Sequence, residues 1–231
     1  MSIRKSTVAW AVMGLLALVP AAHASTIDLL TGADTTIDGG FGAPDTTLFA
    51  QSVVADASLL TTLQLSLQFA SGSDFLFDVH VVGSRSNGGT GLGYDPDMTN
   101  ILWSSSTQTV SSNNDSFFDV FFDIDLPVTT GDTLWVVLDA LTPYAGSDGN
   151  ANLPAWADDY YPNGEFVYMN ASDYGLQTVV DANQYTWDRW PYAPDMGVAV
   201  TFSDSPIVPE PATISLLAIG IAAIVVRRRR L

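Results

Sequence analysis

The chain has 231 residues, of which 47% are hydrophobic and only 14% are charged. This is enough apolar material for a folded core, so the low charge does not indicate disorder. Between residues 25 and 208, Arg85 and Arg189 are the only basic residues against 24 carboxylates, a net charge of −22. Such a surface repels phosphates, which argues against nucleic-acid binding. The chain has no cysteine, which excludes disulfides, thiolate catalysis and cysteine-ligated metals.

The first 24 residues have the three parts of a secretory signal peptide. A basic start is followed by an apolar segment at residues 8–19, and residues 22–24 place alanine at both recognition positions of a cleavage site. We expect signal peptidase to cut between Ala24 and Ser25 once the export machinery has engaged the chain. An uncleaved membrane anchor is the alternative, but the apolar segment is short for a span.

Residues 25–206 alternate between polar and apolar side chains with a period of two. The alternation is clear in segments 59–69, 75–82, 118–126, 134–138, 166–168 and 198–202. Strands with one dry and one wet face are typical of antiparallel sheets. Glycine-containing turn signals separate these segments, and we expect no amphipathic helix among them.

The body is therefore predicted to be all-β, an antiparallel two-sheet sandwich of about eight strands that folds as one domain. A jelly roll is the favoured topology, and an immunoglobulin-like sandwich is the alternative. An N-terminal signal helix and a short C-terminal transmembrane helix complete the expected structure. The fold class by itself implies no activity.

The catalytic inventory of the body is small. Its one histidine, His80, lies on the polar face of a predicted strand, where we expect a surface position. No Gly-x-Ser-x-Gly motif is present, and the glycine-rich segment 88–93 lacks the following helix that would present its N-terminus to a phosphate. We therefore expect no catalytic residues and no enzyme. A Ser-His-Asp triad assembled in space stays open, because its members need not be neighbours in sequence.

Calcium is the cofactor that the abundant aspartates would suit, since hard cations take clustered oxygen ligands. The densest stretch begins like an EF-hand loop, but Leu153 stands at the sixth position, where a glycine is needed, and an aspartate replaces the bidentate glutamate at the twelfth. The alternative is that these side chains serve turns and keep strand edges wet. The candidate ligands are Asp148, Asn150, Asn152, Asp158 and Asp159.

Aromatic residues gather in two stretches that are predicted to be long loops. Exposed rings there would stack on sugar faces, with nearby polar groups binding the hydroxyls. The alternative is that the rings cap the open ends of the sandwich core. The candidate sugar-stacking residues are Trp156, Tyr160 and Tyr161 in the first stretch, and Trp187, Trp190 and Tyr192 in the second.

The C-terminus also has three parts. A Pro209-Glu210-Pro211 motif precedes an apolar segment at residues 212–226, and the chain then carries four consecutive arginines, Arg227, Arg228, Arg229 and Arg230. The apolar segment is about 22 Å long as a helix, short against a hydrocarbon core of about 30 Å, and snorkelling arginines close the gap. We expect the arginines to anchor the cytoplasmic end, leaving the motif extended and accessible on the far side.

This tail resembles the PEP-CTERM sorting signal of Gram-negative bacteria. The resemblance implies that an exosortase, a membrane enzyme, recognises Pro209, Glu210 and Pro211 and cuts the tail near this motif. The body would then pass to the cell surface or the exopolysaccharide matrix. The alternative is a plain tail anchor, in which case the body stays on the inner membrane. Segments 101–104, 117–120 and 127–134 also look like the β-sandwich ectodomains that are often joined to such tails.

These features together predict a signal peptide at 1–24, an ectodomain at 25–206 and a sorting signal at 207–231. The function expected is that of an exported, non-catalytic surface or extracellular-matrix protein associated with exopolysaccharide or biofilm, with carbohydrate binding or adhesion as its activity. A secreted hydrolase of matrix polysaccharide is the alternative. The expected partners are the exosortase, signal peptidase and export machinery, and exopolysaccharide, with the inner membrane as an intermediate location.

Overall fold

A computed structural model describes residues 24–204, apart from residues 44–45, 90, 114, 145, 147, 191 and 193. The predicted signal helix and transmembrane helix lie outside the described residues, as does the whole sorting motif. Within the part of the chain that is described, no helix has the length and hydropathy of a membrane span.

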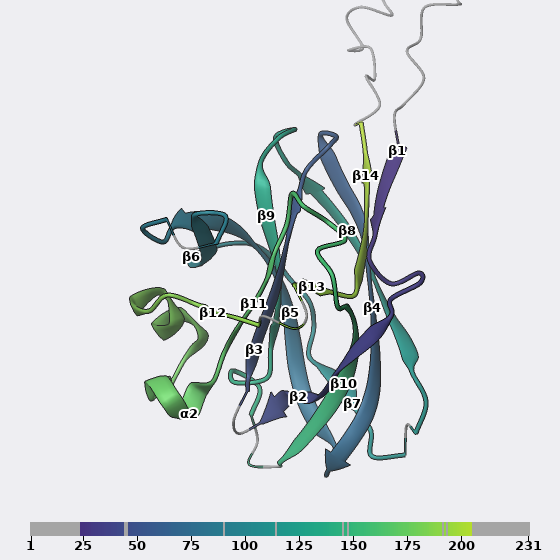
Figure 1. Cartoon of the computed structure of the whole chain (residues 1–231), viewed down its shortest axis with the longest axis vertical. Coiled ribbons are helices and arrows are strands. Elements are labelled where there is room, and N and C mark those ends of the chain that lie inside the picture. The colour runs from purple at the N-terminus through teal and green to yellow at the C-terminus, as the bar shows by residue number, and fades with distance from the viewer. Residues whose placement is uncertain are drawn as a thin grey trace, which may run out of the picture. The chain divides into compact units, whose positions relative to one another are not determined.

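The described residues form two antiparallel sheets (Figure 1). The first sheet contains β1 (Ala24–Asp28), β2 (Thr35–Ala43), β4 (Leu59–Gly72), β8 (Phe118–Pro127), β10 (Gly149–Trp156), β13 (Asp195–Met196) and β14 (Val198–Ser203). The second contains β3 (Leu48–Val54), β5 (Phe75–Ser86), β6 (Tyr94–Ser104), β7 (Gln108–Val110), β9 (Thr133–Asp139), β11 (Phe166–Met169) and β12 (Asp188–Arg189). The predicted all-β, two-sheet architecture is confirmed, and the choice between a jelly roll and an immunoglobulin-like sandwich stays a prediction.

The long strand β4 organises the first sheet. Its residues 59–65 pair with β14 and residues 59–67 pair with β8, whereas residues 68–72 pair with β10. Strand β1 pairs with β14, so that Ala24 lies opposite Ser203. The first and last strands of the described domain are therefore neighbours, and their outer ends lie together (Figure 1).

The main core lies between the two sheets and is rich in phenylalanine. The ring of Phe41 contacts those of Phe49, Phe75 and Phe77, with centroids 5.4–5.8 Å apart, and Phe49 meets Phe166 edge-on at 5.0 Å. All five rings are at most 1% exposed. Such tilted and edge-on pairs add to the stabilisation that burial alone provides.

Two strands of the second sheet, β3 and β9, are buried on both faces, which the sequence did not predict. Six of the seven residues of β3 are buried, and so are six of seven in β9, instead of every second one. The helix α2 (Ala171–Tyr174), the 3-10 helix η1 (Val179–Gln184) and β12 lie beside β11 on the side away from β4 (Figure 1). Trp135 and Trp187, 0% and 1% exposed, fill this second core.

No amphipathic helix was expected in the body, and the two helices found within residues 171–184 do not contradict this. Both helices are too short to show an amphipathic period. Local signals do define them, because Gly175 ends α2 with φ of +64°. Thr178 and Asp181 form a capping box at the start of η1, with 2.8 Å between the Thr178 amide and Asp181 Oδ2.

Candidate functional sites

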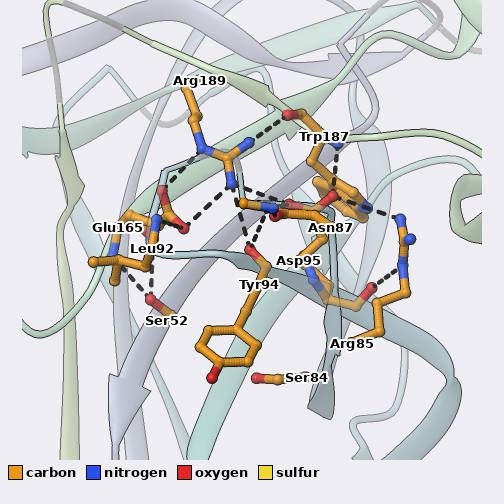
Figure 2. A network of polar contacts seen from close by, with 12 residues as sticks. Ser52, Ser84, Arg85, Asn87, Leu92, Tyr94, Asp95, Glu165, Trp187 and Arg189 are labelled. Carbon is orange, nitrogen blue, oxygen red and sulfur yellow. Dashed lines mark hydrogen bonds and ion pairs between the residues drawn. The ribbon is translucent and has the colours of Figure 1, made fainter.

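The two arginines of the acidic body both reach one buried carboxylate (Figure 2). Asp95 of β6 is 0% exposed, and its Oδ1 lies 3.1 Å from Arg189 Nη2, while its Oδ2 lies 3.6 Å from Arg85 Nη2. Asn87 Nδ2 donates to Oδ1 at 2.8 Å, and the Trp187 backbone amide donates to Oδ2 at 3.1 Å. The carboxylate is thus surrounded by donors and cations.

Glu165 completes this cluster from the residue before β11. Its Oε2 accepts from Arg189 Nε at 3.0 Å, and its Oε1 accepts from the Leu92 amide at 3.2 Å (Figure 2). Gly91 has φ of +60°, and a Cβ there would lie 2.2 Å from both Arg189 Nε and Glu165 Oε2. The two cations and two carboxylates give a balanced charge. We name Arg85, Asp95, Glu165 and Arg189 the arginine cluster.

The arginine cluster was not predicted from the sequence, where Arg85 and Arg189 stand out only as the two basic residues of an acidic body. The rarity of arginine was the only signal in the sequence. It did not identify the ion pairs, because 24 carboxylates were available as partners for two arginines. The cluster joins β5, β6, β11 and β12. It therefore attaches β12 and the outer layer to the strands of the second sheet. Its charged side chains pair with one another, which indicates a structural role.

His80 is 7% exposed, so the expected surface position is wrong. It lies on β5, between β6 and β9, where its Nδ1 is 2.8 Å from Ser104 Oγ on β6 and its Nε2 is 3.4 Å from Asp139 Oδ2 on β9. Ser104 is exposed and Asp139 is 0% exposed. The other oxygen of Asp139 accepts from the amides of Leu141 and Thr142 at 2.8 and 3.0 Å.

A second carboxylate lies beside this group. Asp78 is directly opposite Asp139 in the register of β5 and β9, and it precedes His80 by two residues on the same face. Among the described groups, the Oδ1 atom of Asp78 is buried without a hydrogen-bond partner. Two aspartates therefore lie on the same face of the sheet as the imidazole, and one of them, Asp139, is in contact with it.

The predicted EF-hand-like loop is instead strand β10, which contains Asn150 and Asn152. Asn150 Oδ1 accepts from Ser71 Oγ at 2.9 Å, and Asn152 Nδ2 donates to Gln68 Oε1 at 3.1 Å. Asp148 precedes the strand, and its Oδ1 accepts from the Tyr144 hydroxyl at 2.9 Å. Asp158 and Asp159 follow the opposite end of β10.

Across residues 24–204, omitting those not described, no group of three or more acidic or histidine side chains could hold a metal ion. The alternation of β10 and the partners of its two asparagines favour a structural role for this stretch. Calcium binding there stays a prediction.

The six predicted sugar-stacking residues have very different environments. Trp187 is 1% exposed, so neither face of its ring is open to a sugar, and this part of the prediction is wrong. Trp190 is partly buried against Tyr168, and the half-buried Tyr161 hydroxyl accepts from the Val54 amide at 3.1 Å. Tyr192 is 79% exposed.

Trp156 and Tyr160 form the one stacked tryptophan–tyrosine pair among the described rings. Their centroids are 3.9 Å apart and their planes differ by 5°. The Trp156 indole donates to the Leu29 carbonyl at 3.0 Å, and this bond fixes the Trp156 ring. Tyr160, the other ring of the pair, is 54% exposed. A flat aromatic surface is therefore presented at the end of β10.

Asp195 holds this aromatic loop in place and was not predicted. It is 0% exposed, and its Oδ2 accepts from the amides of Tyr160 and Tyr161 at 2.9 and 2.8 Å. Gln51 Nε2 donates to Oδ1 at 3.1 Å. Burial raises the pKa of the Asp195 carboxyl, although these N–H donors act in the opposite direction.

The predicted processing sites lie at or beyond the ends of the described domain. Ala24 and Ser25 begin β1, and the Ser25 hydroxyl donates to the Asp56 carboxylate. Pro209, Glu210, Pro211 and the four terminal arginines lie outside the described residues. A cleft among the described residues has a volume of about 280 Å³ and is lined by none of the predicted site residues, but by Leu102, Pro127, Val128, Thr129, Asp132 and Leu134.

The described residues define an all-β domain of two antiparallel sheets, one of them covered on its outer face. A family model of the PEP-CTERM protein-sorting motif matches residues 208–230, so the chain carries this motif at its C-terminus, as the resemblance predicted. The motif implies an exported protein that passes a membrane and is recognised by an exosortase. A comparison with curated proteins and a comparison with solved structures each found no match.

Proposed function

We propose that this chain is a surface or extracellular-matrix protein of a Gram-negative bacterium, which an exosortase releases from an inner-membrane intermediate. The observation that carries the proposal is the sorting motif at residues 208–230, which follows β14 after a short connection. Signal peptidase would generate the N-terminus at Ser25, and the exosortase would act on the chain near Glu210. This function requires no catalysis by the β-sandwich itself.

The experiment follows the tail in a host that carries an exosortase. The wild-type protein should lose its tail and leave the membrane fraction, whereas Glu210→Ala should insert normally but accumulate with its tail attached. Replacing the four terminal arginines with alanine tests the anchor separately, because charged groups resist entry into hydrocarbon. Equal release of the wild type and Glu210→Ala would reject the motif as the recognition element.

We further propose that the domain binds exopolysaccharide through the stacked Trp156–Tyr160 pair. The support is the geometry of this pair, with one ring fixed by a hydrogen bond and the other 54% exposed. Stacking of a sugar face on such a ring needs little rearrangement. The nearby Asp158 and Asp159 carboxylates are available to accept from sugar hydroxyls.

Retention of the processed protein on the producer's own exopolysaccharide tests this binding. Tyr160→Ala should weaken retention, whereas Phe121→Ala, which removes a ring that is 69% exposed on β8, should not. Equal loss in both variants would indicate nonspecific adsorption and reject the site. A reducing-sugar assay on the same material tests the alternative of a polysaccharide hydrolase.

A further inference from the structure

Ser104, His80 and Asp139 form a row across three neighbouring strands of the second sheet. The row runs from exposed Ser104 on β6, through His80 at 7% exposure on β5, to Asp139 at 0% on β9. The contacts are 2.8 Å from Ser104 Oγ to His80 Nδ1 and 3.4 Å from His80 Nε2 to Asp139 Oδ2. The hydroxyl therefore faces solvent while the carboxylate lies inside.

The carboxylate determines which ring nitrogen carries the hydrogen. An ionised Asp139 can only accept, so Nε2 of a neutral His80 must donate to it. Nδ1 is then the acceptor, and the Ser104 hydroxyl has to be the donor of the 2.8 Å bond. A base is thus aimed at the proton of an exposed alcohol, which is the arrangement that activates a serine nucleophile.

The strand register adds a backbone donor at the same place. The Ser105 amide donates to the Val79 carbonyl at 2.8 Å, so Val79 and Ser105 are a hydrogen-bonded position of the antiparallel ladder. His80 and Ser104, the next pair, then occupy a non-hydrogen-bonded position, where side chains approach most closely. The Ser104 amide consequently points away from β5, and among the described residues β6 pairs with β5 alone.

Charge around the ring favours the proton transfer. When the serine hydroxyl loses its proton, His80 becomes an imidazolium. Asp139 is 3.4 Å away, and Asp78 lies opposite Asp139 on the same face. The cation that forms therefore lies against the Asp139 carboxylate, which stabilises it.

We propose that Ser104 is a nucleophile for acyl transfer from small activated esters, with His80 as its general base and Asp139 as the residue that positions the ring. Ser104 Oγ attacks the ester carbonyl and its proton passes to His80 Nδ1. The bond to the leaving oxygen then breaks, and that oxygen takes the proton from Nδ1. Water repeats the sequence on the acyl-serine, releasing the acid and restoring the hydroxyl.

The Ser104 amide, which does not pair with β5, is the backbone donor that we assign to the oxyanion formed during attack. This activity goes beyond the proposed sorting and binding functions, and it would replace the expectation of a non-catalytic domain. It depends on neither the exosortase nor the stacked aromatic pair.

The test uses the processed, exported protein with a fluorophosphonate probe and with p-nitrophenyl acetate. We expect one phosphonylated serine, located at Ser104 by mass spectrometry, and loss of that label in Ser104→Ala. Ser106→Ala is the matched control, because Ser106 is exposed in the same serine run and its hydroxyl accepts from Gln108 Nε2 instead. His80→Gln should slow labelling by about 100-fold, the lower range for loss of a general base.

The role of Asp139 needs a readout that a change in stability alone would not move. In the wild type, ¹⁵N chemical shifts should place the hydrogen of neutral His80 on Nε2. In Asp139→Asn the side-chain amide can donate to Nε2, so the hydrogen should move to Nδ1 and labelling of Ser104 should fall.

The proposal is overturned if Ser104 reacts no faster than Ser106 in the wild type, or if a folded His80→Gln variant labels at the wild-type rate. If His80→Gln does not fold, Ser104→Ala and Ser106→Ala decide the matter, because both remove only an exposed hydroxyl. Esterase turnover that survives Ser104→Ala would also reject it.

Discussion

Two polar clusters on the second sheet both have a buried aspartate at their centre, yet they differ in what surrounds it. In the arginine cluster, Asp95 meets two guanidinium groups, and further donors occupy both of its oxygens. In the other cluster, Asp139 faces a histidine and lies opposite another aspartate. In the arginine cluster the charges balance one another, and the cluster holds strands of the sheet together. In the other cluster the Ser104 hydroxyl is exposed and hydrogen-bonded to His80, so it is available to react with a substrate.

The largest effect should come from Asp95→Asn, which removes the central negative charge of the arginine cluster. Arg85 and Arg189 would then share one site with only Glu165 to balance them. Breaking a buried ion pair in this way costs about 3–5 kcal/mol of unfolding free energy. Urea denaturation measures the loss, and Asp123→Asn on the exposed face of β8 is the control, with an expected change below about 0.5 kcal/mol. A similar change in both variants would contradict the role of the cluster.

Gly91→Ala tests how closely the backbone covers the arginine cluster. Its positive φ and the clash with Arg189 and Glu165 together should cost about 2–4 kcal/mol. Gly88→Ala is the matched control, because φ is +81° there but nothing lies within 4 Å of the added Cβ. It should cost only the conformational part, about 1–2 kcal/mol. Equal decreases in melting temperature for Gly91→Ala and Gly88→Ala would mean that Arg189 and Glu165 can move aside without a loss of stability.

Asp195 is a third fully buried aspartate, and no cation faces it among the contacts of its carboxyl group. Asp195→Asn places an amide donor against N–H groups that already donate, which should cost about 1–3 kcal/mol. Burial raises the pKa of the native carboxyl, so the folded state binds its proton more tightly than the unfolded chain does.

The Asp195 contribution is therefore largest at acid pH and is lost as pH rises from the unfolded value of 3.8 through the native pKa. Urea midpoints of both proteins, measured from pH 3.5 to 7, check the sign. The midpoint difference between wild type and Asp195→Asn should narrow as pH rises. A difference that widens over this range would contradict the inferred direction.

The smallest effect concerns Asp188, the neighbour of Arg189 on β12, which binds a neutral donor instead of a cation. The Tyr174 hydroxyl donates to Asp188 Oδ2 at 2.7 Å, and this bond is the main cause that raises the pKa of Tyr174 to about 12. Tyr174→Phe should cost about 0.5–1.5 kcal/mol at neutral pH. The difference from wild type should shrink above pH 10, where unfolded tyrosine ionises first. A constant difference would argue against the bond.

Strands with one face exposed to solvent were predictable from the alternating sequence pattern. Strands buried on both faces were harder to predict. The alternation in β4 and β8 survives because one face of the first sheet is wet. In β3 and β9 the outer layer covers the second face, so apolar residues follow one another and the period is lost.

The sorting motif was found because its recognition depends on a short contiguous sequence. The Ser104, His80 and Asp139 row, and the arginine cluster, depend on strand order, since each joins residues from separate strands. The single histidine and the two arginines were visible in the composition, but their partners were not. Trp187 shows the same limit, because a tryptophan suited to stacking in a loop is equally suited to a core.

The pairing of the terminal strands has a mechanical consequence. β14 lies between β1 and β4 and forms antiparallel ladders with both, up to Ser203 at its end. A pull on the chain beyond Ser203 loads this strand along its length, so the hydrogen bonds of two ladders resist together in shear instead of opening one by one. The strand that transmits force from the C-terminal end is therefore held from both sides, while β1 at the sheet edge carries little of that load.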